Sequence, residues 1–568
     1  TLAVSTAHAE TRCVDTDEDP STCLCDPTVT QNYSSIQSAI DSAINGDTIL
    51  ICGGTYNENV DVNKQVDLIG YASGQVKIRA IDTGDHVLNI TKPCLVKNIT
   101  VSGARGSAGI YVKSNNVTIK SVTSSNNKYG IYIESSTNVS VNDSLVQKND
   151  EYGIYATSSA NITLTNNEIK DNSKTDESDD DCFDYKKFYA VYIGDTDNVQ
   201  IINNEIKDNY FKKWSYTGSL SSNKIYGVYL SNVGNGTIEN NIIRNNYLYA
   251  RFDGEEADVV DNKVYGILLD GCSDVTIKNN IIKSNYLTDT GESFIYAYFN
   301  KMCGIYLKNS DNNTLSENTV RDINIHGIYF YHESFTNEVY GIYIDGSSND
   351  NVISNSTIDG NYIGSNVLSR NLKAYGIRLQ GDNNIVVNNT ITDTKVDTQS
   401  GRCGDDYAYG IYIGGENNNI TKNIFEKTMV KLEHMDEGEA YAYGVYMTGS
   451  NNRFSNNTIS ETSATKGDGD YGIYAYGVYM TGSNNRFSNN TISETSADEL
   501  YGDCDVYVYA YGMLVDSVSN GVVAYNSISN SEDYDLYIVN SNILFYKNTL
   551  SPKETMITFE CIGRVKFK

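Results

Sequence analysis

Residues Tyr441–Ala464 read YAYGVYMTGSNNRFSNNTISETSA, and residues Tyr474–Ala497 repeat the same twenty-four residues 33 positions later. A compact globular core gives no reason for two identical neighbouring segments. A solenoid does, because each repeat buries its apolar side against the next repeat. Degenerate copies of this segment run through most of the 568-residue chain. The duplicated segment therefore predicts a repeat architecture that grows along one axis.

The copies share a motif of Gly-Ile/Val-Tyr-Ile/Leu, a Ser/Asn turn, Thr-Ile and Asn-Asn. Its first residue, the motif glycine, occurs at Gly109, Gly130, Gly153, Gly227, Gly304, Gly341, Gly410, Gly444 and Gly477, with weaker copies at Ala190, Gly266, Gly376 and Gly512. Alternate residues of a strand face opposite sides, so the aliphatic residues face one way and the tyrosine between them the other. The predicted core residues are Ile131, Ile133, Ile154, Ile305, Leu307, Val445 and Met447.

The first motif glycines are 21 and 23 residues apart, and Asn-rich turns separate the short strands. This spacing is typical of one coil of a β-helix. Stacked coils would place turn asparagines about 4.8 Å apart, where they can form hydrogen-bonded ladders. We therefore interpret the Asn-x-Ser/Thr sequons first as ladder residues and second as glycosylation acceptors; they include Asn116, Asn138, Asn161, Asn456 and Asn489.

After Gly153 the spacing rises to between 33 and 39 residues, so each coil gains a dozen or more residues just before the next motif glycine. Insertions at a common position of a solenoid stack on one face. Those between about residues 171 and 511 alternate aromatic and small residues, which predicts a second, Tyr-rich sheet or arm beside the main helix. The candidate assembly-face residues are Phe211, Trp214, Tyr296, Tyr298, Tyr329, Tyr331, Tyr507 and Tyr509.

The segment from Tyr33 to Ile44 has apolar residues at helical spacing, and two short strand patterns follow it. The run from Tyr33 to Tyr71 resembles the opening of right-handed parallel β-helix proteins of the pectin-lyase-like class, which includes carbohydrate-binding and sugar-hydrolase repeats. The resemblance implies an amphipathic helix that caps the first coil. We predict an all-β, right-handed parallel β-helix with a capping helix within residues 33–46 and a stacked insert layer. The predicted division is a Cys-containing segment, 1–32, and a single solenoid, 33–568.

The acidic pairs that could catalyse carbohydrate chemistry are Asp179–Asp181 and Asp405-Asp406, both in inserts and without an aligned Arg, Lys or His. The acid and Gly-His-Gly pattern of polygalacturonases is missing. His326 and His332 lack ligands at metal spacing, and the run at Asp179 is more simply a solvated surface than a Ca²⁺ site. The sequence predicts no catalytic, cofactor-binding or metal-binding residues, and a protein that is not an enzyme.

The chain has 11 cysteines and a net charge of −29. The charge excludes nucleic acid as a partner, since phosphate binding needs a basic stripe. No apolar run is long enough to span a bilayer, and the chain begins at Thr1, so we expect a secreted protein whose signal peptide has been removed. We interpret Cys52 as a buried free thiol. The disulfide or cross-link candidates are Cys13, Cys23, Cys25, Cys94, Cys182, Cys272, Cys303, Cys403, Cys504 and Cys561.

Two functions remain open. The secreted, acidic, Tyr-rich and repeat-built character is similar to that of surface and sheath proteins of methanogenic archaea. That resemblance implies an extracellular homopolymer at the cell surface, a sheath, wall or filament reinforced by disulfides, with cell-surface glycans as possible further partners. The alternative is a secreted β-helix that binds or cleaves polysaccharide.

Overall fold

The computed structural model describes residues 9–15, 32–71, 76–176, 186–215, 218–252, 256–289, 294–328, 336–365, 371–398, 404–434, 438–468, 472–500, 507–551 and 566–567. The described secondary structure is one α-helix and many short β-strands. The chain forms two compact units: unit 1 (residues 1–174, 188–210 and 227–242) and unit 2 (175–187, 211–226 and 243–568). The division at residue 32 stays a prediction. None of the described residues belongs to a helix long and apolar enough to span a bilayer.

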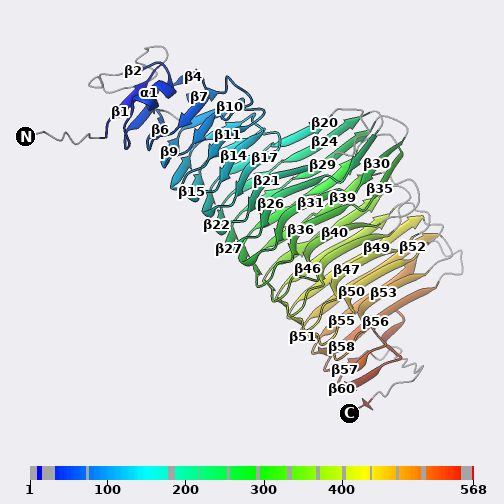
Figure 1. The fold of residues 1–568 in the computed structure, drawn as a ribbon. Coiled ribbons are helices and arrows are strands. Elements are labelled where there is room, and N and C mark those ends of the chain that lie inside the picture. The colour runs from blue at the N-terminus through cyan, green and yellow to red at the C-terminus, as the bar shows by residue number, and fades with distance from the viewer. Residues whose placement is uncertain are drawn as a thin grey trace, which may run out of the picture. The chain divides into compact units, whose positions relative to one another are not determined.

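Each coil of unit 1 contains three strands, one in each of three parallel sheets, A, B and C (Figure 1). One coil consists of β14 (Tyr129–Glu134) in sheet C, β15 (Thr137–Asn142) in sheet A and β16 (Leu145–Gln147) in sheet B. The next consists of β17 (Tyr152–Thr157), β18 (Ala160–Thr165) and β19 (Glu168–Lys170). Each strand pairs in parallel with its equivalent in the next coil, as Ile131 does with Ile154. The predicted parallel β-helix is confirmed.

The aliphatic residues of the motif form the core in both units. Full burial is found for all of the predicted core residues, Ile131, Ile133, Ile154, Ile305, Leu307, Val445 and Met447. Their register across coils places like side chains against like, for example Val445 of β50 (Ala440–Met447) opposite Val478 of β53 (Ile473–Met480). The predicted inward positions are therefore confirmed.

The motif glycine is needed because neighbouring coils approach closely there. A Cβ added at Gly130 would lie 2.4 Å from Val146 Cγ1 and 2.5 Å from the carbonyl oxygen of Gly153. Real Cβ atoms do not approach other atoms so closely, so a side chain would push the coils apart.

Asparagine ladders run along the turns of unit 1. On the exposed ladder, Asn138 Nδ2 donates to Asn116 Oδ1 at 2.9 Å and Asn161 Nδ2 donates to Asn138 Oδ1 at 2.7 Å. All three asparagines have positive φ, which Asn tolerates better than most residues. A second ladder is buried, and in it Asn149 Nδ2 donates to Asn172 Oδ1 at 2.9 Å. The predicted ladders are thus present.

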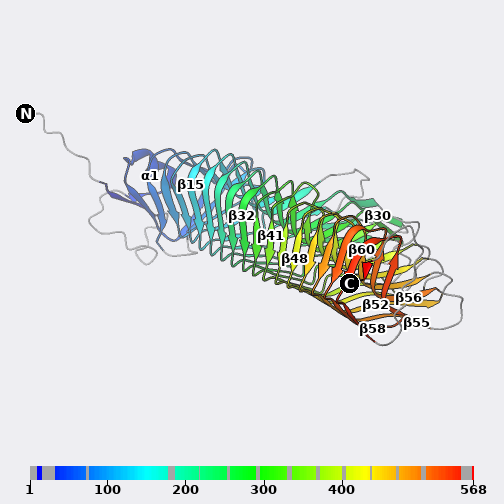
Figure 2. The same cartoon turned by 90° about the horizontal axis from the view of Figure 1, so that it is seen from below.

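Helix α1 (Ile36–Ser42) lies at the first coils of unit 1 (Figure 2). Ser35 caps it by accepting a hydrogen bond from Ser38 N, and Glu58 accepts from the free backbone N–H groups of Ile36 and Gln37. The apolar face is buried against β1 (Thr11–Val14), β3 (Thr48–Ile51) and β5 (Val60–Val62). The expected capping helix is confirmed.

In unit 2 the described parts of the inserts extend the core. The strands β46 (Thr390–Thr398), β49 (Ile424–His434), β52 (Thr458–Asp468) and β55 (Thr491–Glu499) each bend at a residue with positive φ. Beyond the bend, Val396, Val430 and Ala464 are buried. They belong to strands that contact β47 (Asp406–Ile413), β50 and β53, whose Ala408, Ala442 and Ala475 are fully buried. We call this second apolar layer the lobe core.

The candidate assembly-face residues of the inserts differ in how exposed they are. Phe211 of β24 (Tyr210–Ser215) was expected on an assembly face but is 3% exposed, because it alternates with outward residues and faces inward. Tyr507 is 65% exposed, and Tyr509 stacks on Tyr474 at 5.7 Å. Tyr296 and Tyr298 lie in β35 (Phe294–Tyr298), which pairs in a small parallel sheet with β30 (Glu256–Val260) and β25 (Gly218–Ser221). The side chains of Trp214, Tyr296 and Tyr298, and all of Tyr329 and Tyr331, lie outside the described residues.

Candidate functional site

The outer face of sheet C in unit 2 carries side chains in rows. Its strands are β31 (Lys263–Asp270), β36 (Lys301–Lys308), β40 (Asn337–Ile344), β44 (Leu372–Leu379) and β47, paired in parallel and in register. The residue before each motif glycine and the residue two places after it both face outward. Register therefore aligns them into two rows across successive coils.

The two rows are mostly tyrosine. The first tyrosine row contains Tyr265, Tyr340, Tyr375, Tyr409, Tyr443 and Tyr476, with Cys303 in one position. The second tyrosine row contains Tyr306, Tyr343, Tyr412, Tyr446 and Tyr479, with Arg378 in one position. Ring centroids are 4.9 Å apart between Tyr340 and Tyr375 and 4.7 Å apart between Tyr306 and Tyr343, with nearly parallel planes. The face is thus a regular aromatic surface.

Charged rows border the tyrosines on both sides. On one side Lys263, Lys301, Glu338 and Lys373 are in register. On the other side lie Asp270, Lys308, Asp345 and Gln380. There Lys308 Nζ lies 2.8 Å from Asp270 Oδ2, and Tyr343 donates its hydroxyl proton to Gln380 Oε1 at 2.7 Å.

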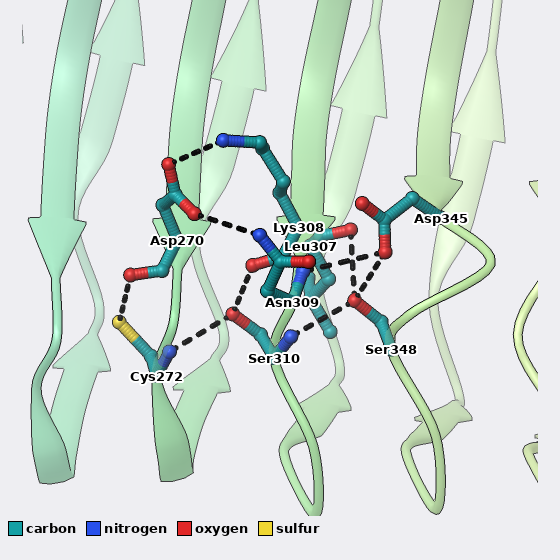
Figure 3. Close-up of polar contacts among 8 residues, drawn as sticks. All are labelled: Asp270, Cys272, Leu307, Lys308, Asn309, Ser310, Asp345 and Ser348. Atoms are coloured by element: carbon teal, nitrogen blue, oxygen red, sulfur yellow. Dashed lines mark hydrogen bonds and ion pairs between the residues drawn. The ribbon is translucent and has the colours of Figure 1, made fainter.

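The turn that follows this border is tied across coils by short polar contacts (Figure 3). Asn309 Nδ2 donates to Asp270 Oδ1 at 3.4 Å, and Ser310 N donates to Ser348 Oγ at 2.9 Å. Cys272 N donates to Ser310 Oγ at 3.0 Å. These bonds satisfy buried backbone groups and hold the border in place.

Arg378 interrupts the second tyrosine row between Tyr343 and Tyr412. Its Nη1 donates to the Tyr340 hydroxyl at 2.8 Å and to Glu338 Oε1 at 3.3 Å. Its guanidinium carbon lies 5.1 to 5.7 Å from the ring centroids of Tyr340, Tyr343, Tyr375 and Tyr412. Lys301 Nζ lies 3.1 Å from the other carboxylate oxygen of Glu338. We call Lys301, Glu338, Lys373 and Arg378 the charged cluster.

Within the charged cluster, Glu338 and Arg378 are held in their ionised forms at neutral pH. Burial alone would raise the pKa of Glu338, but Lys301, Tyr340 and Arg378 outweigh it and hold that pKa below its ordinary value. Burial alone would lower the pKa of Arg378, and the neighbouring Tyr340, Tyr375 and Glu338 hold it above the ordinary value instead. Burial raises the pKa of Tyr343 to about 12, so that phenol stays neutral. The cluster can bind an anionic group, and the phenols can donate or accept hydrogen bonds.

A separate hollow of about 440 Å³ lies in unit 2 and is lined by Lys427, Met429, Glu461, Ser463, Glu494, Thr495, Ser496, Asn530 and Glu532. Burial and the neighbouring Glu426 raise the pKa of Glu461. The described residues include no group of three or more His, Cys, Asp and Glu side chains suited to a metal ion. The sequence reasoning named none of the residues that line this hollow.

Several cysteine expectations need correction. Cys52 is fully buried as expected but is disulfide-bonded, as is Cys13, so its assignment as a free thiol is wrong. Cys94, Cys272 and Cys303 are buried and not disulfide-bonded, which argues against their role as cross-links. Cys303 lies in β36, within the first tyrosine row and not in an insert. Cys23, Cys25, Cys182, Cys403, Cys504 and Cys561 lie outside the described residues.

The other residues singled out in the sequence do not come together. His326 packs 5.4 Å from the Tyr286 ring. Asp406 is fully buried and accepts a hydrogen bond from Leu372 N at 2.8 Å, while Asp405 accepts from the Tyr407 hydroxyl. Asp179–Asp181 and His332 lie outside the described residues. The sequence reasoning missed Arg378, although the motif itself marks it: Gly376-Ile-Arg-Leu379 has arginine where other copies have tyrosine.

Comparisons with known proteins place the chain among β-helices. The family model for the right handed beta helix region matches residues 87–341 and 409–561. The model for the periplasmic copper-binding protein NosD matches residues 292–439. The comparison with curated proteins gives no match.

Solved structures match the chain at low identity and low TM-score. The A-module of the mannuronan C-5 epimerase AlgE4 of Azotobacter vinelandii is 18% identical, with 53% of this chain and 96% of that chain covered and a TM-score of 0.25. The DFA-IIIase of Arthrobacter chlorophenolicus A6 is 12% identical, with 60% and 93% covered and a TM-score of 0.29. The catalytic unit of a GH87 alpha-1,3-glucanase of Streptomyces thermodiastaticus strain HF3-3 is 10% identical, with 72% and 61% covered and a TM-score of 0.25.

These neighbours are carbohydrate-processing enzymes, and they contradict the expectation that the chain is not an enzyme, which we withdraw. The expectation rested on searching for acidic pairs in the sequence, and a β-helix can assemble a site from residues on several coils. The similarity to sheath proteins gains no support from any of these matches. The fold and the family model together establish that the chain belongs to the right-handed β-helix family.

Proposed function

We propose that this chain is a carbohydrate-binding β-helix protein and that an extended glycan lies across the outer face of sheet C in unit 2. The observation that carries the proposal is the pair of in-register tyrosine rows between two charged rows. Tyrosine combines an apolar ring with a hydroxyl, and a sugar combines apolar C–H groups with hydroxyls. The two surfaces are therefore chemically complementary.

The repeat of the face also suits a polymer. Equivalent side chains recur about every 4.8 Å along the stack, similar to the length of one sugar unit in an extended chain. Successive sugars would meet successive tyrosines of the second row, of which Tyr412 and Tyr446 are only half-buried. The border residues Lys308, Asp345 and Gln380 supply donors and acceptors for hydroxyl groups.

The test is glycan binding by the full chain, measured calorimetrically over a panel of neutral and acidic oligosaccharides, with product analysis of the same samples. The variant with Tyr412→Ala and Tyr446→Ala is expected to lose at least tenfold in affinity, about 1.4 kcal/mol. Tyr525→Ala, at a 47% exposed tyrosine outside the two rows, is the matched control. Binding that is unchanged in the double variant, or no glycan bound at all, would contradict the proposal.

A second candidate is self-association at the cell surface into a sheath or filament. It is favoured by the same tyrosine rows, because a regular half-buried aromatic face can also contact another copy. The cysteines left for disulfide reinforcement are those outside the described residues, such as Cys182, Cys403 and Cys504. Sedimentation and electron microscopy of native material, with and without reductant, separate this candidate: a monomer under both conditions would exclude a cross-linked polymer.

A further inference from the structure

We infer that Arg378 with Lys301 and Lys373 forms a receptor for the carboxylate group of an acidic sugar, and that Glu338 occupies the receptor when no glycan is bound. The inference rests on the proposed glycan-binding face and names its substrate class. It predicts which glycans bind, where on the face the acidic group lies, and which residue competes with it.

The first observation is the substitution of one row member. The four nearest residues in register with Arg378 are Tyr306, Tyr343, Tyr412 and Tyr446. A tyrosine at position 378 would continue the stack at no electrostatic cost. An arginine there must keep a charge partly out of water, which is unfavourable unless that charge is paired.

The second observation is that the pairing is incomplete. Both hydrogen bonds of the Arg378 side chain use Nη1, and neither Nη2 nor Nε has a hydrogen-bond partner among the described residues. The side chain remains 19% exposed. Arginine binds a carboxylate best through two parallel N–H donors. Nε is buried, so a planar anion would bind through Nη2 and, where it displaces Glu338, Nη1.

The third observation is the local reversal of charge. The chain carries a net −29, yet three of the four residues in the border row on this side are lysines, namely Lys263, Lys301 and Lys373. Lys373 Nζ lies over the Tyr407 ring at 5.3 Å and has no carboxylate partner among the described residues. Lys263 is paired with Asp261 at 2.7 Å and Lys301 with Glu338 at 3.1 Å, so Lys373 is the lysine of this row that is left to steer an anionic ligand to this position.

Glu338 is the single acid of that border row, and both of its carboxylate oxygens contact cations. Oε1 accepts from Arg378 and Oε2 contacts Lys301. A carboxylate on a sugar would find the same two cations and, in addition, Lys373. Glu338 therefore keeps the cations paired in the free protein and competes with the ligand carboxylate.

The experiment compares polygalacturonate oligomers with their carboxyl-reduced, neutral counterparts and with dextran sulfate, using the full chain. Arg378→Tyr continues the tyrosine row and so is expected to fold. It should weaken binding of the acidic oligomer at least tenfold and leave the neutral oligomer within twofold. Glu338→Gln should strengthen binding of the acidic oligomer severalfold, because it removes the competing carboxylate. Arg453→Tyr, at an exposed arginine of sheet A, is the matched control.

The outcomes separate the two proposals. If the neutral oligomer binds as well as the acidic one, or Arg378→Tyr affects both equally, the carboxylate receptor is wrong and the glycan face stands. If dextran sulfate binds as tightly as the acidic oligomer and Arg378→Tyr weakens both alike, the interaction is general charge attraction and the receptor is again wrong. If no oligomer binds, the glycan face itself is wrong.

Discussion

The coils of unit 1 and those of unit 2 use one sequence motif to make two different surfaces. In unit 1 the chain passes from β16 to β17 through a short turn, and the tyrosines Tyr129 and Tyr152 before the motif glycine are half-buried. In unit 2 the lobe core is added to the coils of β46, β49 and β52, and the tyrosines that follow it before the motif glycine, Tyr409, Tyr443 and Tyr476, are at most 7% exposed. Lengthening one turn therefore changes the environment of a tyrosine row without changing the motif.

The difference also separates the roles of the two units. In unit 2 the first tyrosine row is buried, and the charged cluster packs against it. In unit 1, Tyr111 donates its hydroxyl proton to Glu134, and Lys113 lies opposite Glu134 on the border that corresponds to Asp270 and Lys308 of unit 2. No arginine interrupts the tyrosines at Tyr132 and Tyr155. The recognition site that we propose is thus a property of unit 2.

The largest expected effect comes from a charge in the lobe core. Ala464→Asp would place a carboxylate at a buried position of β52 and is expected to destabilise unit 2 by more than about 3 kcal/mol. Thr465→Asp, one residue later on the outward side and opposite Lys431, should change stability by less than about 1 kcal/mol. Urea unfolding followed by circular dichroism measures both. Equal effects would mean that the inserts do not form a core.

Removal of a buried ladder residue should come next in size. Asn149 Nδ2 donates to Asn172 Oδ1 and to the carbonyl of Ser124, and its Oδ1 accepts from Asn127 N. Asn149→Ala leaves these buried groups unpaired, which costs roughly 2–3 kcal/mol. Asn138→Ala on the exposed ladder removes two hydrogen bonds that water can replace and places alanine at a positive φ, with an expected loss of about 1 kcal/mol. Thermal unfolding of the two variants, compared directly, tests whether burial sets the difference.

The sequence predicted the stack well and its surface poorly. Ile131 and Ile133 could be assigned to the core because a period of two and the recurrence of the motif depend only on local sequence. The capping helix could be predicted for the same reason, because the spacing of Ile36, Ala39 and Ile40 is also a local pattern. Phe211 was misplaced because its direction depends on a bend at the turn that precedes it. The bonded state of Cys52 depends on a partner cysteine that spacing does not specify.

Arg378 shows a second reason why a site cannot be predicted from the sequence alone. Its position in the motif is visible in the sequence, but its meaning depends on Glu338 and Lys301, which lie 40 and 77 residues earlier in the chain. Only the register of three strands brings them together. In a solenoid with inserts of variable length, the register is not readable from spacing alone, so a site built across coils is missed by a search for paired acids within one segment.

A smaller effect is expected at Asp406. This residue occupies the coil position that is asparagine in two earlier coils, at Asn300 and Asn337. Burial raises the pKa of Asp406 to about 8, and Asp405 adds to the rise. The native state therefore prefers the protonated form, and stability is lost as the pH rises from the ordinary aspartate value of about 4 through pH 8. Asp406→Asn should stabilise unit 2 by almost nothing at pH 3 and by an amount that grows as the pH rises from about 4 to 8. A gain that does not depend on pH would argue against a buried, protonated carboxyl group.

The smallest expected effect compares single tyrosines of the two units in alkali. Burial raises the pKa of Tyr155 in unit 1 to about 12 and that of Tyr443 in unit 2 well above its ordinary value. In both cases the native state holds the phenol proton longer than the unfolded state. The stability that each gives is complete below the ordinary phenol pKa of about 10 and is lost as the pH rises through the native value.

Relative to its phenylalanine variant, each tyrosine should cost about 1 kcal/mol one pH unit above that ordinary value. For Tyr155→Phe the difference should level off near pH 12, whereas for Tyr443→Phe it should keep growing. Urea unfolding at a series of alkaline pH values, with Tyr507→Phe at an exposed side chain as the control, measures it. Because Tyr155 lies two places after its motif glycine and Tyr443 directly before its own, identical pH curves for Tyr155→Phe and Tyr443→Phe would mean that the first-row position under the lobe core is no better shielded from water than a second-row position of unit 1.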